Sequence, residues 1–123
     1  MIRILIDTNV LMAIADLKID IFTELQKACD FIYEPFVLGG SIQELEKIMR
    51  EERLRFHRAA KLALALLRLK KVAIIPSEGQ VDDVLVEYSK QGDLILTQDL
   101  QLKKRLQHPY LTIRQRKRII LVR

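Results

Sequence analysis

Four acidic residues stand where an apolar, strand-like run or a loop gives way to a predicted helix. They are Asp7, Glu44, Asp82 and Asp99. If the strands form a parallel sheet, their carboxyl ends share one edge, and we expect the four carboxylates to lie together there. Carboxylates without a histidine partner suit hard divalent cations such as Mg²⁺ or Mn²⁺. Because such ions promote phosphodiester hydrolysis, the four acids predict a metal-dependent nuclease holding one or two ions.

Each acid also has a simpler explanation at the end of a helix. Asp7 and Asp99 occupy positions that suit helix N-caps, and Asp82 suits the first turn of a helix. Glu44 completes a capping-box pattern that begins at Ser41. Separate caps give no reason for four acids to gather, whereas bound cations would offset their mutual repulsion. The conjunction therefore favours a metal site.

Neighbouring residues are expected to complete this site. Asp82 precedes a second acid, Asp83, and the spacing of Asp82 from Leu85 and Ser89 predicts that Asp82 faces inward. Asp83 is the alternative or supporting ligand. Three further polar side chains could hold a water, a carboxylate or a phosphate, although ordinary turn chemistry would also explain them. They are Thr8, Asn9 and Thr97.

Short apolar strands alternate with helices along the chain and must position these residues. Strands or extended segments are predicted at 2–6, 31–37, 72–76, 93–97, 112–113 and 119–122. Helices are predicted at 10–17, 21–28, from Ser41, at 55–69, at 81–90 and at 99–106. This alternation is typical of an α/β fold with a parallel sheet and right-handed crossovers.

Composition restricts the class of protein. The chain has 123 residues, of which 50% are hydrophobic and 30% charged, so we expect one ordered domain over residues 1–123. Cys29 is the single cysteine, which rules out an intrachain disulfide and favours the reducing cytoplasm. We expect no signal peptide and no membrane span, because the apolar stretches are too short.

The positive charge is concentrated at the C-terminal end. Residues 100–123 hold eight Lys and Arg and no acid, whereas residues 1–99 hold 13 Lys and Arg against 16 acids. A basic end beside an acidic pocket suits RNA, an anionic polymer, although a solvated charged surface is the simpler reading. The candidate RNA contacts are Arg50, Arg53, Arg55, Arg58, Lys103, Lys104, Arg105, Arg114, Arg116, Lys117 and Arg118.

Four segments carry a family resemblance. They are Ile4–Leu11 with its Asp-Thr-Asn, Ser41–Leu45, Asp82–Leu85, and Ile95–Asp99 with its Thr-Gln-Asp. Their order and separations resemble those of the PIN-domain ribonucleases from residue 1 to about residue 113. The chain departs from many family members at Gln98, where they have asparagine. Residues 97–106 look more like the ribosome-maturation branch than like VapC-type toxins, and a toxin role stays open.

The resemblance implies a three-layer α/β/α sandwich around a central parallel sheet. It also implies a Mg²⁺- or Mn²⁺-dependent endoribonuclease whose products carry 5′-phosphate and 3′-hydroxyl ends. Its metal ligands and catalytic residues would be Asp7, Glu44, Asp82 and Asp99. Family members commonly form homodimers, and the apolar surface of the helices within residues 41–69 could serve that purpose.

Two functions from different classes follow. The first is cleavage of single-stranded RNA, in rRNA processing or as a VapC-type toxin that a partner antitoxin would silence. The alternative is a catalytically weak RNA-binding factor that assists ribosome assembly, which would need the basic surface but not four carboxylates. A nucleotide-binding domain is disfavoured, because the chain has Gly39-Gly40 but no glycine-rich phosphate-binding motif.

Overall fold

Six strands form one mixed sheet in the computed structural model, which describes residues 1–123. The strands are β1 (Ile2–Ile6), β2 (Tyr33–Leu38), β3 (Ala73–Ile75), β4 (Leu94–Leu96), β5 (Tyr110–Arg114) and β6 (Arg118–Val122). Their order across the sheet is β3-β2-β1-β4-β5-β6. β1 to β5 pair in parallel, as predicted, and β6 pairs antiparallel with β5.

The antiparallel direction of β6 follows from the short loop that precedes it. A parallel neighbour needs a crossover of about a dozen residues or more. Only three residues separate Arg114 from Arg118, and the Lys117 amide donates to the Arg114 carbonyl at 3.3 Å. The chain therefore folds back as a hairpin, which makes the sheet mixed rather than wholly parallel.

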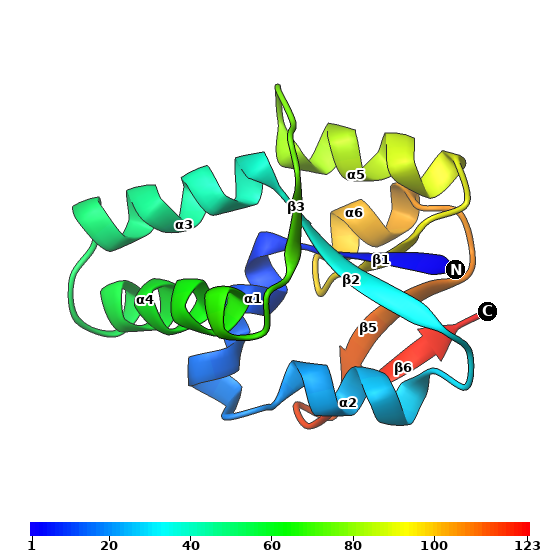
Figure 1. Cartoon of the computed structure of the whole chain (residues 1–123), viewed down its shortest axis with the longest axis horizontal. Helices are drawn as coiled ribbons and strands as arrows, with labels where there is room; N and C mark the ends of the chain where they lie inside the picture. Colours follow the sequence, from blue (N-terminus) through cyan, green and yellow to red (C-terminus); the bar gives the residue numbers. More distant parts are fainter.

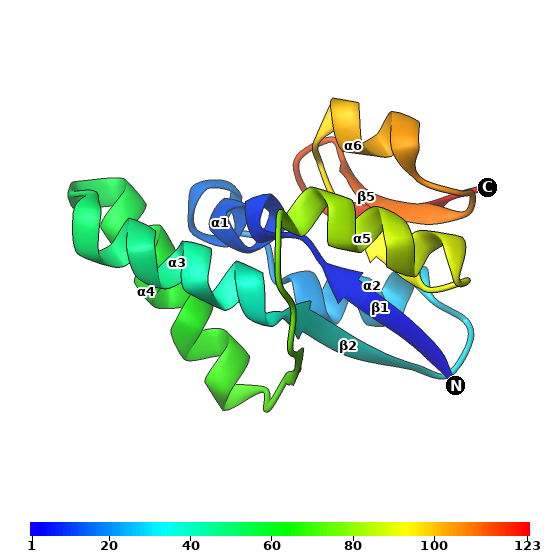
Figure 2. The ribbon, with the colours of Figure 1, turned by 90° about the horizontal axis from the view of Figure 1, so that it is seen from above.

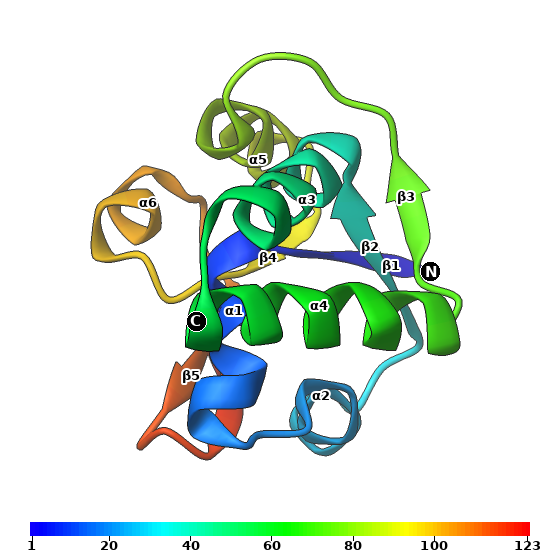
Figure 3. The same cartoon turned by 90° about the vertical axis from the view of Figure 1, so that its left-hand side faces the viewer.

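Helices cover both faces of the sheet. They are α1 (Thr8–Leu17), α2 (Ile21–Ala28), α3 (Gly39–Glu51), α4 (Leu54–Leu69), α5 (Val81–Lys90) and α6 (Leu100–Arg105). α1, α2 and α4 lie on one side and α5 and α6 on the other (Figure 3). This is the predicted three-layer α/β/α arrangement. None of the helices combines the length and apolar character that a bilayer-crossing segment requires.

The pleat of the strands divides the core between these two sides. In β1, Ile4 and Ile6 join the larger cluster of 18 buried residues, while Leu5 between them joins the smaller cluster of seven. β4 alternates in the same way, with Leu96 on the larger side and Ile95 on the other. Because successive side chains of a strand point to opposite faces, a run of apolar residues serves both layers.

Pro35 lies within β2 and does not interrupt it. Pro35 lies opposite Ile4 of β1, and β3 pairs only with Phe36–Leu38. On the side away from β1, no strand pairs with Pro35, so this side is an edge of the sheet. The missing backbone N–H of proline is tolerated at such an edge.

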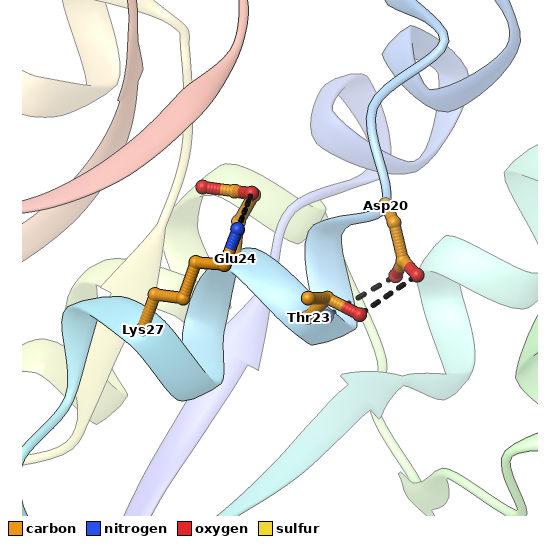
Figure 4. A network of polar contacts seen from close by, with 4 residues as sticks. All are labelled: Asp20, Thr23, Glu24 and Lys27. Atoms are coloured by element: carbon orange, nitrogen blue, oxygen red, sulfur yellow. Dashed lines mark hydrogen bonds and ion pairs between the residues drawn. The ribbon is translucent and has the colours of Figure 1, made fainter.

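Helix α2 shows what an acid does when it only caps a helix. Asp20 accepts hydrogen bonds from the Thr23 amide at 3.1 Å and from the Thr23 hydroxyl at 2.8 Å (Figure 4). These two bonds hold the pKa of the Asp20 carboxyl below its usual value. One turn on, Lys27 lies 3.4 Å from Glu24 on the exposed face. The hydrogen bonds of Asp20 are those of an acid that only caps a helix, and the four predicted site acids can be compared with them.

Helix α3 begins at Gly39, two residues before the predicted capping box, so that box is absent. A Cβ on Gly40 would lie 2.9 Å from Val81 Cγ2, and the Gly40 amide donates to the Ser77 hydroxyl at 2.9 Å. Glycine therefore lets the first turn of α3 approach the start of α5 closely. Ser41 becomes a buried residue inside the helix rather than its cap.

The first turns of α1, α3 and α5 converge at the carboxyl edge of the sheet (Figures 1 and 2). α3 and α4 lie side by side and extend beyond this edge, which gives the molecule a projecting helical hairpin (Figure 1). The edge and the hairpin together frame the site described next.

Candidate active site

A cleft of about 490 Å³ opens at the carboxyl edge of the sheet. All four predicted acids line it, and they come from the ends of β1 and β4 and from the first turns of α3 and α5. Its full lining is Asp7, Thr8, Asn9, Met12, Glu44, Ile48, Glu52, Phe56, Asp82 and Asp99. The structure thus brings together residues that lie as far as 92 positions apart in sequence.

Asp7 differs from a capping acid such as Asp20. It stands before α1, yet its side chain makes no capping bond. Its Oδ2 instead accepts a hydrogen bond from the Thr97 hydroxyl at 2.7 Å. Its amide donates to the Leu96 carbonyl at 2.9 Å. Only 4% of Asp7 is exposed, so the carboxylate is buried without serving the helix.

The surroundings of Asp7 favour its protonated form. Burial raises its pKa to about 6, and the nearby Asp82 and Glu44 carboxylates act in the same direction. The hydrogen bonds from Thr97 and from the Thr8 amide oppose this rise. A carboxylate that is buried beside other carboxylates is stabilised in its charged form by a cation.

Thr97 connects Asp7 to Asp99. Its hydroxyl donates to Asp7 and accepts a hydrogen bond from the Asp99 amide at 3.0 Å. Asp99 does cap α6, because its Oδ1 accepts from the amides of Gln101 at 2.8 Å and Leu102 at 3.2 Å. Its Oδ2 is not used by the cap. The capping role and a role in the cleft are therefore compatible for this residue.

Thr8 orients Glu44 from the neighbouring helix. The Thr8 hydroxyl lies 2.9 Å from Glu44 Oε1 and 2.9 Å from the Ser41 hydroxyl. A carboxylate can only accept, so Thr8 donates to Glu44 and the Ser41 hydroxyl can donate to Thr8. These two hydrogen bonds connect the exposed Glu44 side chain to the buried residues Thr8 and Ser41, and they fix its direction. Glu44 therefore contacts α1 rather than the amide that the capping box predicted.

Asp82 and Asp83 are separated by the folded structure. Asp82 lines the cleft, whereas Asp83 forms an ion pair with Arg105 Nη2 at 2.7 Å. The expectation that Asp82 faces the cleft agrees with this placement. Asp83 is turned toward Arg105 of α6, and its role as the alternative or supporting ligand stays a prediction. Arg105, a candidate RNA contact, is correspondingly engaged with a carboxylate.

Asn9 links α1 to the loop after β4. Its Oδ1 accepts a long hydrogen bond of 3.4 Å from the Gln98 amide. The side-chain amide nitrogen of Asn9 remains available for the cleft. All three predicted supporting residues are thus in or beside the cleft.

Four further cleft residues were missed from the sequence, and two of them, Met12 and Ile48, are aliphatic. The other two are Glu52, at the end of α3, and Phe56, in the first turn of α4. Glu44, Ile48 and Glu52 are spaced four residues apart, and this signal could have identified Glu52, which is the C-cap of α3. No local pattern identified Phe56, because its place depends on how α4 folds back along α3.

The donors of the cleft are oxygens, which suits Mg²⁺ or Mn²⁺. No three acid, histidine or cysteine side chains converge closely enough to ligate one ion together. Mg²⁺ in particular is often held by one or two carboxylates, with water and substrate phosphate completing its shell. An open arrangement of carboxylates around a buried Asp7 fits this mode of binding.

The candidate RNA contacts fall into two groups on the surface. Arg50, Arg53 and Arg55 lie at the turn between α3 and α4, and all three are exposed. The second group comprises α6 and the β5–β6 turn. Lys103 is half-buried there, and burial and the charge of Arg114 lower its pKa. The members of the second group are Lys103, Lys104, Arg105, Arg114, Arg116, Lys117 and Arg118.

A three-layer α/β/α fold with a carboxylate cleft at the carboxyl edge is the arrangement expected of a PIN-like domain. The sequence model described as "PIN like domain" matches residues 4–118, and the chain belongs to this family.

Two proteins show the likeness in detail. Ribonuclease VapC4 of Methanocaldococcus jannaschii is 26% identical over 123 residues, covering 95% of this chain and 94% of that protein. The solved structure of the PIN domain endonuclease Utp24 matches with a TM-score of 0.76 and 24% identity. That match covers 97% of this chain and 90% of the Utp24 chain, and it shows that the two share their fold.

Proposed function

We propose that this protein is a divalent-metal-dependent endoribonuclease that cleaves single-stranded RNA. The observation that carries the proposal is the cleft in which Asp7, buried and free of any capping role, faces Glu44, Asp82 and Asp99. The names of the two similar proteins describe a ribonuclease and an endonuclease, which supports the same class of reaction.

Pairs of the four carboxylates would hold one or two Mg²⁺ or Mn²⁺ ions, with water and substrate phosphate completing each shell. When bound, such ions supply Lewis acidity at the phosphate and lower the pKa of an attacking water. The chain's own residues prepare the ligands for this. Thr97 fixes the direction of the Asp7 carboxylate, and Thr8 fixes that of Glu44. Hydroxyl groups in these positions reduce the reorganisation that binding requires.

The two basic groups would guide the RNA to the cleft. One lies on the projecting α3–α4 hairpin and the other on α6 and the β5–β6 turn. Because cations near the substrate path raise the local concentration of an anionic polymer, they favour association before cleavage. We propose that the backbone of the strand passes between the two groups and brings one phosphate to the carboxylates.

The proposal covers either of two cellular roles, rRNA processing or action as a VapC-type toxin. The likeness to VapC4 supports the toxin role, and a toxin would require a partner antitoxin. A homodimer, a ribosome-assembly partner and a cytoplasmic location stay predictions from the sequence.

The test is cleavage of a labelled single-stranded RNA in Mg²⁺, in Mn²⁺ and in EDTA. We expect metal-dependent cleavage that Asp7→Asn reduces by at least about 100-fold, since loss of a ligand should exceed the 10- to 100-fold effect of its supporting residues. Asp20→Asn is the matched control. It makes the same chemical change at a remote helix cap and should cleave like the wild type.

Cleavage at the wild-type rate by Asp7→Asn would contradict the assignment. Salt-sensitive RNA binding by the wild type without cleavage in either metal would favour the alternative, an RNA-binding factor with a weak or silent site.

A further inference from the structure

A smaller recess adjoins the carboxylate cleft on the side of α4. Its volume is about 190 Å³, and Asn9, Met12 and Phe56 line both the recess and the cleft. A pocket for a drug-sized ligand usually measures about 300–1,000 Å³, so this recess suits a smaller group. Because the two spaces share three side chains, a molecule lying across the cleft can place one substituent in the recess.

The recess offers an aromatic ring that the core does not use. Phe56 is 49% exposed, although it is large and apolar. It stands in the first turn of α4, immediately after a tight turn in which Leu54 has a φ of 53°. This turn directs Phe56 back toward the cleft. An exposed aromatic ring beside four carboxylates contributes little to stability, and it is available to a ligand.

Arg55 lies over this ring and is held only by a weak ion pair. Its guanidinium carbon is 5.2 Å from the centre of the Phe56 ring. Its ion pair with Asp16 is 3.4 Å long, and both side chains are more than half exposed, so the pair is weak. Arg55 can therefore yield to an incoming planar group or stack upon it.

We propose that the recess binds one nucleobase of the RNA strand whose backbone crosses the carboxylate cleft. The Phe56 ring provides the stacking face and Met12 the apolar floor. Arg55 covers the base, and the free amide of Asn9 faces its polar edge. This inference rests on the proposed endoribonuclease function, because it places the base beside the phosphate that would be cut.

The chemistry of the recess selects a base rather than another small group. Bases of unpaired RNA stack on aromatic rings and on guanidinium planes. A base within a duplex is already stacked and paired, so it cannot enter. The recess thus gives a structural reason for preferring single-stranded RNA, and it fixes the register of the strand at the carboxylates.

The test measures binding of short single-stranded RNAs by fluorescence anisotropy in EDTA, where a metal-dependent nuclease does not cut. One RNA is intact, and each of the others lacks the base at one position. We expect Phe56→Ala to weaken binding of the intact RNA about 5- to 150-fold, the loss typical of one stacked base. Phe56→Trp should retain binding, and Phe56→Leu should lose most of it, because leucine keeps apolar bulk without a planar face.

The decisive result is coupling between the ring and one base. Removal of that base should weaken wild-type binding as much as Phe56→Ala does, and it should have no further effect on the variant. Leu69→Ala, at the far end of the same helix, is the matched control. Leu69 is 74% exposed, and its loss should change nothing.

Equal binding by Phe56→Ala and the wild type would overturn the inference, as would additive losses at every abasic position. A wild type that binds no RNA would overturn it too. A parallel cleavage assay keeps the two proposals apart. Coupling without cleavage would support the base-binding recess and contradict the nuclease proposal. Cleavage without coupling would support the nuclease proposal and contradict the base-binding recess.

Discussion

Asp7 is a carboxylate that folding removes from water and surrounds with other acids. Burial raises its pKa to about 6, and Asp82 and Glu44 reinforce this effect. Asp20, which only caps a helix, has a pKa below its usual value because Thr23 donates two hydrogen bonds to it. The opposite pKa shifts distinguish Asp20, whose charged form stabilises the fold, from Asp7, whose charged form destabilises it.

The raised pKa predicts how metal-free stability depends on pH. Because the folded pKa lies above the unfolded value of 3.8, the contribution of Asp7 is favourable at low pH and is lost as pH rises through about 6. The loss is at most about 3 kcal/mol, since each pKa unit corresponds to about 1.4 kcal/mol. In EDTA, Asp7→Asn should therefore gain stability relative to the wild type between pH 4 and pH 7.

Thermal unfolding of both proteins across this pH range checks the prediction. Asp20→Asn supplies a control of opposite sign, because a lowered folded pKa gives stability that is present above the unfolded value and lost on acidification. A difference between Asp7→Asn and the wild type that does not vary with pH would show that Asp7 has the same pKa in both states.

At the scale of elements, the site depends on where helices begin. α3 starts at Gly39 because Gly40 can approach Val81, and this contact brings the first turns of α3 and α5 together. α4 starts at Leu54, whose φ of 53° lies in the left-handed region that suits glycine. Leu54 is 76% exposed, so its side chain is not needed for packing. The helical hairpin is thus closed by a strained turn.

Replacing Leu54 with glycine should relieve this strain. A left-handed conformation costs an L-residue about 1–2 kcal/mol, and part of the gain is offset by the greater freedom of glycine in the unfolded chain. We expect Leu54→Gly to raise the free energy of unfolding by about 0.5–1 kcal/mol, measured by urea denaturation. Leu54→Val, which is β-branched, should lower it. A stabilising valine would mean that the turn does not hold this φ in solution.

At the scale of the whole molecule, charge is separated across the carboxyl edge. The acids line the cleft, and the candidate cations lie on the α3–α4 hairpin and on α6 with the β5–β6 turn. The two basic clusters near the C-terminus interact, because the charge of Arg114 on the β5–β6 hairpin lowers the pKa of Lys103 on α6. Such a distribution suits a polyanion that spans the cleft.

The salt dependence of RNA binding should distinguish free cations from paired ones. Each phosphate contact on single-stranded RNA contributes about 0.7 to the slope of log K against log salt. Lys104 is exposed and forms no ion pair, so Lys104→Ala should reduce the slope by about this amount. Arg105 is paired with Asp83, so Arg105→Ala should reduce it less. Equal slopes for Lys104→Ala and the wild type would place the RNA elsewhere.

Local patterns in the sequence were enough to predict most of the elements and the edge where the acids meet. The strand Ile2–Ile6 and the helices Ile21–Ala28 and Val81–Lys90 have the bounds that their apolar spacing predicts. A helix or strand that buries one face needs apolar residues at regular intervals along its own sequence. This requirement is local, so it leaves a periodic pattern that can be recognised in the sequence. Asp7 and Asp99 each follow a predicted strand, and this position predicted the edge of the sheet at which the acids meet.

Tertiary structure alone decided the start of α3, the separation of Asp82 from Asp83, and the place of Phe56 at the cleft. Each depends on a contact between distant segments, such as Gly40 with Val81 or Asp83 with Arg105. Local propensity cannot encode these outcomes, because the energy that selects them exists only once the two segments have packed together.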